Sequence, residues 1–254
     1  MTKELALIAL AALVLTVPVL GHGEAQVRIY GPGGPAPAMK NVAALYQERT
    51  GVPVSVTAGP PPRWMPEARE QADALFSGSQ NMMDAFLAAH PDLDSASVTA
   101  LYLRPSTILV RPGNPKDIGG IADLLEPGLR IMVVQGAGQV GLWEDVVGRT
   151  RDVANLQRFR DNIVVHAPNS GAARTRWKED TSLDAWLIWN HWEIDNPGIA
   201  EQVAVEPELA IYRDTAIAIT RKGTANPALP AFLEFLTGPE GEAIFERHGW
   251  QKRF

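Results

Sequence analysis

Short apolar runs alternate with amphipathic segments along most of the chain. The runs carry β-branched and aromatic residues with polar residues between them, which predicts strands. Strands are expected at 26–30, 52–59, 72–79, 129–134, 162–167, 183–189, 201–207 and 209–220, and extended chain broken at Pro105 over 99–115. Helices are expected at 36–49, 81–89, 142–148, 152–161, 169–180 and 189–195, with two more over 227–250 that separate at Gly238. Such alternation predicts βαβ units, parallel sheets and an α/β fold.

The first 25 residues follow a different pattern. Lys3 precedes an apolar stretch from Leu5 to Leu20, and Gly23-Glu24-Ala25 supplies small residues where a signal peptidase cuts. A retained membrane anchor is the alternative, but the stretch is short for a span of about 20 residues and contains Pro18. We therefore expect export to the periplasm, with residues 1–25 removed. The chain has 0 Cys, which excludes disulfides and a lipid anchor on cysteine.

The charge balance limits the class of ligand. The whole chain has a formal net charge of −6, and residues 26–254 hold 22 basic and 27 acidic side chains. Nucleic acids and anionic membrane surfaces select basic patches, so neither is an expected partner. An anion bound by this chain must be held locally, by amides and a few cationic side chains.

Four segments place glycine or serine between an expected strand and an expected helix. Backbone N–H groups at a helix start lie at the positive end of the helix dipole, and small side chains let an anion approach them. Turn and cap roles are the commoner reason for such residues. The four segments are "YGPGGP" with Gly33 and Gly34, "FSGSQNM" with Ser77 and Ser79, "VVQGAGQVG" with Gly138, and "HAPNSGAAR" with Ser170 and Gly171.

These segments also carry a family resemblance. "YGPGGP", "GLWEDVVGRT", "FRDNIVVHAPNSGAAR" and "DAWLIWNHW" resemble the AcfC (accessory colonization factor) type of periplasmic solute-binding protein, over nearly all of residues 26–254. That type belongs to the molybdate- and sulfate-binding-like type II periplasmic binding proteins. The resemblance implies two α/β lobes joined by two hinge crossover strands. It also implies an anion in the cleft, since relatives are associated with carboxylates or phosphorylated acids such as citrate or phosphoglycerate.

The same resemblance implies bounds and partners. Lobe one is expected at 26–110 plus 208–254 and lobe two at 111–207, with "ILVRPGNP" and "ELAIYRD" as the crossings. Closure of the lobes around the ligand would be a hinge motion. The expected partner is the permease of an ABC transporter or a chemoreceptor, and a homodimer is left open.

Two departures from the family pattern affect the expected cleft. Relatives carry a longer Ser-, Thr- and Gly-rich insert where this chain has only Gln139-Val140 between Gly138 and Gly141. "GPPPRW" at 59–64 replaces a Gln-Ala-Thr type of sequence, and prolines have no N–H to donate. Arg63 then offers a planar fork for carboxylate or phosphate, with a solvated surface arginine as an equal alternative.

Two further side chains are candidates for ligand contact. Arg174 lies one turn into the helix that follows "PNSG", so it either reaches the cleft or pairs with a surface acid. Tyr212 lies at the second crossing and offers a hydroxyl. We expect both to contact the ligand.

Other chemistry finds little support. The tryptophans at 143, 186, 189 and 192 suit a buried strand and helix better than a sugar platform. The histidines are too widely spaced for a metal site, no cofactor motif is present, and no nucleophile–base set is apparent. Capture of a small anionic solute is the preferred hypothesis. An inorganic oxyanion as ligand, an envelope enzyme and a surface adhesin remain the alternatives.

Overall fold

The computed structural model describes residues 26–136 and 138–254. The expected signal sequence, 1–25, lies outside the described residues. The strands are β1 (Val27–Gly31), β2 (Val54–Ala58), β3 (Ala74–Phe76), β4 (Thr99–Val110), β5 (Ile131–Val134), β6 (Ile163–Ala167), β7 (Ala185–Trp189), β8 (Glu201–Ala204) and β9 (Tyr212–Ile219). The helices are α1 (Ala36–Thr50), α2 (Pro61–Gln71), α3 (Gln80–Ala89), α4 (Leu142–Gly148), α5 (Val153–Asn162), α6 (Ser170–Glu179), α7 (His191–Ile194), α8 (Arg221–Thr224), α9 (Leu229–Thr237) and α10 (Pro239–Arg247).

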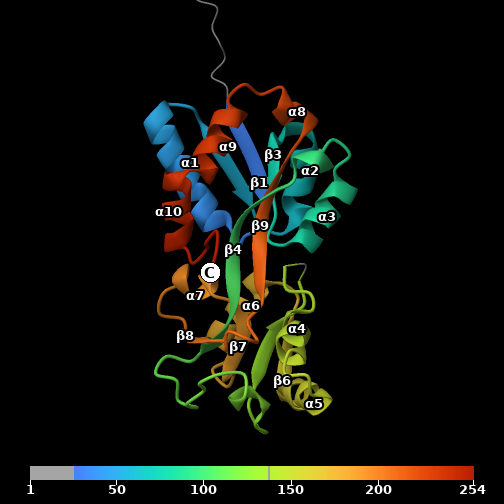
Figure 1. Cartoon of the computed structure of the whole chain (residues 1–254), viewed down its shortest axis with the longest axis vertical. Helices are drawn as coiled ribbons and strands as arrows, with labels where there is room; N and C mark the ends of the chain where they lie inside the picture. Colours follow the sequence, from blue (N-terminus) through green and yellow to red (C-terminus); the bar gives the residue numbers. More distant parts are fainter. Residues whose placement is uncertain (1–25, 137) are drawn as a thin grey trace, which may run out of the picture.

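The strands form two sheets that share β4. The strand order is β2-β1-β3-β9-β4-β7-β5-β6, and β8 pairs with β4. β1 is parallel to β2 and β3, and β5 is parallel to β6 and β7, as expected from the alternating pattern. β4 and β9 are antiparallel to each other and run from one body of the protein to the other (Figure 1). The fold is α/β, with helices packed around each sheet.

The expected break at Pro105 is wrong, because β4 is continuous from Thr99 to Val110. Proline has no N–H for a ladder, but here the ladder changes partner. Residues up to Pro105 pair with β9, and residues from Ser106 onward pair with β7. The Pro105 carbonyl accepts from the Asn190 N–H at 3.2 Å. Pro105 therefore lacks its N–H where β4 passes from β9 to β7, and the strand continues without that donor.

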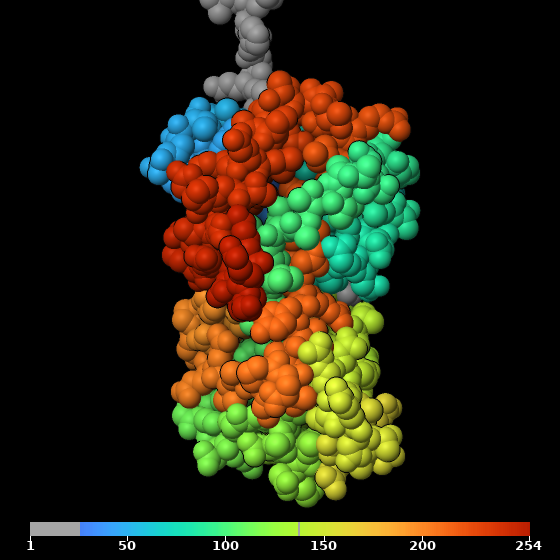
Figure 2. Space-filling view, viewed as in Figure 1, coloured from blue at the N-terminus to red at the C-terminus, as the bar shows by residue number. Residues whose placement is uncertain are grey.

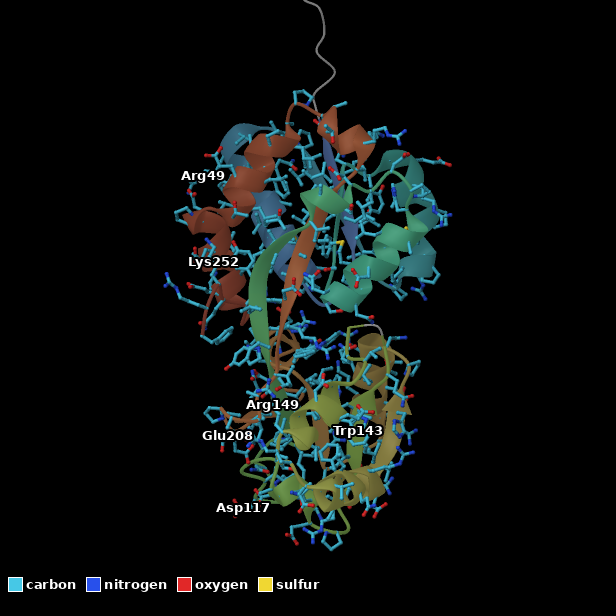
Figure 3. All side chains as sticks on the ribbon, turned by 45° about the vertical axis from the view of Figure 1, so that its right-hand side comes forward. Arg49, Asp117, Trp143, Arg149, Glu208 and Lys252 are labelled. Carbon is cyan, nitrogen blue, oxygen red and sulfur yellow. The ribbon has the colours of Figure 1, made fainter. Side chains whose placement is uncertain are left out.

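Each body has its own hydrophobic core. One core is built from residues between Ile108 and Ala210, and two clusters with members between Val27 and Trp250 fill the other body. Figure 3 places Arg49 and Lys252 on the upper body and Asp117 and Arg149 on the lower one. The C-terminal segment thus returns to the body that contains β1. The residue bounds expected for the lobes remain a prediction.

The C-terminal segment also reaches the junction between the bodies. In the space-filling view its surface, in red, meets the orange surface of the lower body (Figure 2). There the Asn190 side-chain amide donates to the Gly249 carbonyl at 2.7 Å, and His248 Nδ1 lies 2.5 Å from Asp195 Oδ1. These contacts bridge α7 to the residues after α10.

The sequence pattern did not predict α2, which begins at Pro61 and follows Pro60. Prolines interrupt helices in their interiors, but the first turn of a helix needs no backbone N–H donors and the fixed φ of proline suits it. The proline run therefore starts a helix. Trp64 and Met65 on this helix are buried against the sheet.

Candidate functional site: a cleft between the two bodies

A cavity of about 440 Å³ lies where the two bodies meet. Its walls are the turns at 32–35 and 59–61, with Gly78 of the following turn, from one body, and residues 136, 138–139 and 168–171 from the other. These turns follow β1, β2, β3, β5 and β6. In open α/β sheets ligands bind outside the carboxyl ends of the strands, so the position is that of a ligand site.

Four helices begin at the wall of this cavity. α1, α2, α3 and α6 are 15, 11, 10 and 10 residues long, and each starts directly after or within one of the lining turns. The first-turn N–H groups of α1, α3 and α6 carry the positive end of the helix dipole, whereas α2 begins with Pro61 and Pro62, which have no N–H, and contributes its dipole alone. An anion is therefore the kind of ligand that the backbone here favours.

Five of the residues expected to bind the ligand line the cavity. These are Gly33, Gly34, Gly138, Ser170 and Gly171. They come from three different turns and from both bodies, so the structure brings these turns together although the first is more than 100 residues from the other two. Gln139 joins two of the turns, because its Nε2 donates to Ser170 Oγ at 2.9 Å.

Ser77 and Ser79 are not among the lining residues, although both were expected in the cleft. Ser77 is fully buried and its Oγ accepts from the Ala216 N–H. Ser79 is 1% exposed and its Oγ accepts from the Met82 N–H at the start of α3. The turn instead presents Gly78 to the cavity. Ser79 is thus the N-cap of α3, which is the alternative to ligand contact named above, and Ser77 ties the turn to β9.

Arg63 and Tyr212 also lie outside the cavity lining. The Arg63 side chain is exposed on the first turn of α2. Tyr212 is 43% exposed, and its ring centroid lies 5.0 Å from that of Phe254. A ligand role for either residue remains a prediction without support from its position.

Arg174 borders a second, smaller cavity of about 240 Å³. That cavity shares Gly33, Gly34, Gly171 and two further residues with the first one. Arg174 Nη1 donates to Asn196 Oδ1 at 2.9 Å, and the side chain is exposed. It thus lies beside the cleft, paired with a neutral amide.

The charged residue in the cavity wall is Arg104, which the sequence pattern did not reveal. It belongs to β4, one residue before Pro105, and is 2% exposed. Nη2 donates to the Gly78 carbonyl at 2.7 Å, and the guanidinium carbon lies 4.6 Å and 4.4 Å from the ring centroids of Trp189 and Trp250. An arginine inside an otherwise uncharged strand was the one available signal.

The charge of Arg104 is balanced only in part, by the nearby charge of Asp214. Across 26–136 and 138–254, none of the ion pairs includes Arg104. Nη1 lies 3.5 Å from the main-chain oxygen of Asp214, and Nε has no hydrogen-bond partner among the described residues. Burial lowers the pKa of Arg104 to about 9 although the charge of Asp214 acts in the opposite direction, so the group stays charged at neutral pH. A buried cation with no carboxylate in direct contact is costly, and an anion in the cavity would offset that cost.

His191 and Trp192 complete this part of the wall, and neither was expected there. Trp192 lines both cavities, whereas Trp186 and Trp189 are fully buried and Trp143 is 8% exposed, as expected for core residues. His191 starts α7 and is 1% exposed. Burial, Arg104 and His248 together hold the pKa of His191 well below its ordinary value. The imidazole is therefore neutral at neutral pH.

The described residues hold neither a metal-binding cluster nor a membrane-spanning helix. No group of three or more His, Cys, Asp or Glu side chains in 26–136 and 138–254 is arranged to hold a metal ion. Within the same residues, every helix is too short or too polar to span a bilayer.

Comparison with known sequence families assigns the chain. Residues 27–251 match the family described as bacterial extracellular solute-binding protein. The chain belongs to this family. No curated protein sequence matched the chain significantly.

Solved structures of other solute-binding proteins have the same fold. PEB3 bound to L-phospholactate is 38% identical with a TM-score of 0.85, and the match covers 90% of this chain and all of that one. PEB3 from Campylobacter jejuni is 37% identical with a TM-score of 0.83 over the same shares. The sulfate-binding protein SubI from Mycobacterium tuberculosis is 15% identical with a TM-score of 0.72, covering 90% of this chain and 87% of that one, and shows the fold alone. This solute-binding protein is thus a two-lobed, type II periplasmic binding protein.

Proposed function

We propose that this solute-binding protein captures a small anionic solute, an organic carboxylate or a phosphorylated acid, in the cleft between its lobes. Arg104 is the observation that carries the proposal. It lines the cavity, it is 2% exposed, and none of the ion pairs among the described residues includes it. Four helix starts add their dipoles on the same cavity. A bound anion would satisfy both.

The size of the cavity favours an organic acid over an inorganic oxyanion. About 440 Å³ falls within the range of roughly 300–1,000 Å³ that is usual for small-molecule sites. Sulfate or molybdate would fill only a small part of it. The L-phospholactate bound to PEB3, at 38% identity, supports the same class of ligand. Sulfate-like binding is kept as the alternative, since helix starts alone can hold an oxyanion.

The biological setting follows from the ligand class and the family. We infer export to the periplasm, membership of the AcfC type, and delivery of the solute to an ABC permease. The shortened 136–141 turn leaves fewer donors in one wall, so Arg104 carries more of the recognition. Nothing in the described residues supports a chemoreceptor partner, a homodimer, an adhesin role or an enzyme activity, and we propose none of them.

Isothermal titration with citrate, L-phospholactate, phosphoglycerate, sulfate and molybdate tests the proposal. We expect an organic acid to bind most tightly. Arg104→Met should weaken that ligand by about ten- to a hundredfold, because a charged hydrogen bond contributes ~1.5–3 kcal/mol. The substitution removes a buried charge, and the unbranched apolar side chain of methionine fills part of the space. The melting temperature should therefore change little.

Arg149→Met is the matched control. Arg149 also donates to a main-chain carbonyl, that of Ala210 at 2.9 Å, but it lies in the lower body and outside the cavity lining (Figure 3). The Arg149→Met protein should bind the ligand as tightly as the wild type does. Failure of every acid in the panel to bind would refute the proposed function. Tightest binding of sulfate or molybdate would favour the inorganic alternative.

A further inference from the structure

His191 is a buried polar side chain that the fold leaves without partners. Its exposure is 1%, and neither Nδ1 nor Nε2 has a hydrogen-bond partner among the described residues. Buried polar groups are nearly always hydrogen-bonded, and leaving one unpaired costs about 1–3 kcal/mol. An imidazole with two unpaired nitrogens in a ligand cavity therefore indicates a contact that is made only with the ligand.

The ring borders the part of the cleft where an anion is favoured. His191 lines both cavities, and Nε2 would lie 3.2 Å from a Cβ placed on Gly34, in the turn that starts α1. A ligand held by that turn and by Arg104 would lie within reach of the ring.

The charged and titratable groups around His191 come from several elements. Arg104 on β4 and His248 after α10 both act to lower the pKa of the imidazole. Asp195 follows α7 and bonds His248 rather than His191, and Arg174 on α6 borders the same second cavity. The uncharged ring of Trp250 also packs here, with its centroid 5.2 Å from that of the His191 ring. The surroundings thus oppose an imidazolium in the absence of an anion.

We infer that capture of an acidic ligand in this cleft is coupled to protonation of His191, so that ligand and proton bind together. Without a ligand, the positive charge of Arg104 disfavours a protonated ring. An anion placed between Arg104 and His191 would offset that charge and favour the protonated ring. The protonated imidazole has two N–H donors, so both nitrogens would act as donors once the ring is charged. The inference rests on the proposed function and makes His191 a residue that decides specificity and pH response.

The sign of the pH dependence follows from linkage. In the free protein the pKa of His191 lies well below 6.5, and a bound anion raises it. Between the two values, binding takes up as much as one proton. Affinity then rises as pH falls, by up to about tenfold per pH unit. Above the pKa of the bound state, this contribution is absent.

Titration calorimetry with L-phospholactate in buffers of different ionisation enthalpy measures the coupled protons. We expect the wild type to take up as much as one proton more per ligand than His191→Gln between pH 6 and 8. The difference between the two proteins removes the titration of the ligand itself. His166→Gln is the matched control, because His166 is exposed on β6 and outside both cavities. It should take up protons like the wild type.

A second measurement needs no variant and covers the case in which His191→Gln fails to fold. In the isotope-labelled wild type, the NMR chemical shifts of the His191 ring nitrogens report whether the ring is protonated. At pH 7 they should change from the values of a neutral imidazole to those of a protonated one when L-phospholactate is added. Binding with equal proton uptake in all proteins and an unchanged neutral ring would overturn the inference and leave the proposed function intact. Absence of binding by the whole acid panel would instead defeat the proposed function and this inference with it.

Discussion

At the scale of single residues, the cleft contrasts two arginines in different settings. Arg104 is buried under two tryptophan rings, whereas Arg174 is exposed and bonded to Asn196. A buried charge interacts strongly with a ligand because little water screens it, and an exposed one interacts weakly. The sequence pattern singled out Arg174 because it lies one turn into the helix that follows "PNSG". From its burial we expect Arg104 to have the larger role.

Removing Arg174 should therefore have a modest effect. We expect Arg174→Ala to weaken the best acid of the panel by up to about fivefold, because exposed charge pairs contribute ~0.2–1 kcal/mol. Raising the salt concentration should reduce this difference. Arg63→Ala, which removes another exposed arginine but one outside both cavities, should weaken binding less. Equal losses for both variants would contradict the placement of Arg174 beside the ligand.

At the scale of elements, the first Gly-rich turn depends on a close approach between β1 and β3. A Cβ on Gly31, the last residue of β1, would lie 2.5 Å from the ring of Phe76 and from its carbonyl oxygen. Only glycine fits there without a shift of backbone. This contact fixes where β1 ends and so where the turn at 32–35 enters the cavity.

Gly31→Ala should lower the free energy of unfolding by about 1–3 kcal/mol, because the added methyl overpacks the junction of two strands. Chemical denaturation measures the change. Gly148→Ala is the control, since no atom lies within 4 Å of the Cβ it would add at the end of α4. Its stability should stay the same or rise slightly. A Gly31→Ala protein as stable as the wild type would show that β1 and β3 can move apart freely.

At the scale of the whole molecule, side-chain contacts hold the two bodies together beside the cleft. Asp195 and His248 belong to opposite bodies, and their side chains are mostly buried. The Asn190–Gly249 bond lies in the same region. These contacts hold α7, which carries His191, against the end of the chain.

Asp195→Ala should let the bodies separate more easily. We expect small-angle scattering to give a larger radius of gyration for the free variant than for the free wild type, and saturating ligand to reduce the difference. Asp92→Ala removes an exposed carboxylate that pairs with Arg221 at 3.0 Å within one body. This control should scatter like the wild type. Unchanged scattering of Asp195→Ala would mean that the pair does not restrain the bodies.

Much of the architecture could be predicted from local pattern. Alternating strands and helices set the α/β class. The strand-to-helix turns predicted a shared cleft that Gly33, Gly34, Gly138, Ser170 and Gly171 line, whereas Ser77 and Ser79, expected in the same cleft, are not among the lining residues. Local rules erred at the prolines. Pro105 interrupts nothing because the ladder changes partner there, and Pro61 starts a helix instead of removing donors from a loop. Both outcomes depend on neighbours that are distant in sequence.

The sequence by itself determined the negative overall charge and most of the alternating elements, because strand and helix patterns depend on residues close together along the chain. Only the tertiary structure decided what faces the ligand. Arg104 reaches Gly78, Trp189 and Trp250 because the strand order places β4 between β9 and β7. His191 joins the cavity because α7 packs against the end of the chain. The local pattern marks Arg104 only as a charge inside a strand and does not mark His191 at all, since proximity across a sheet arises from long-range pairing and not from spacing in the sequence.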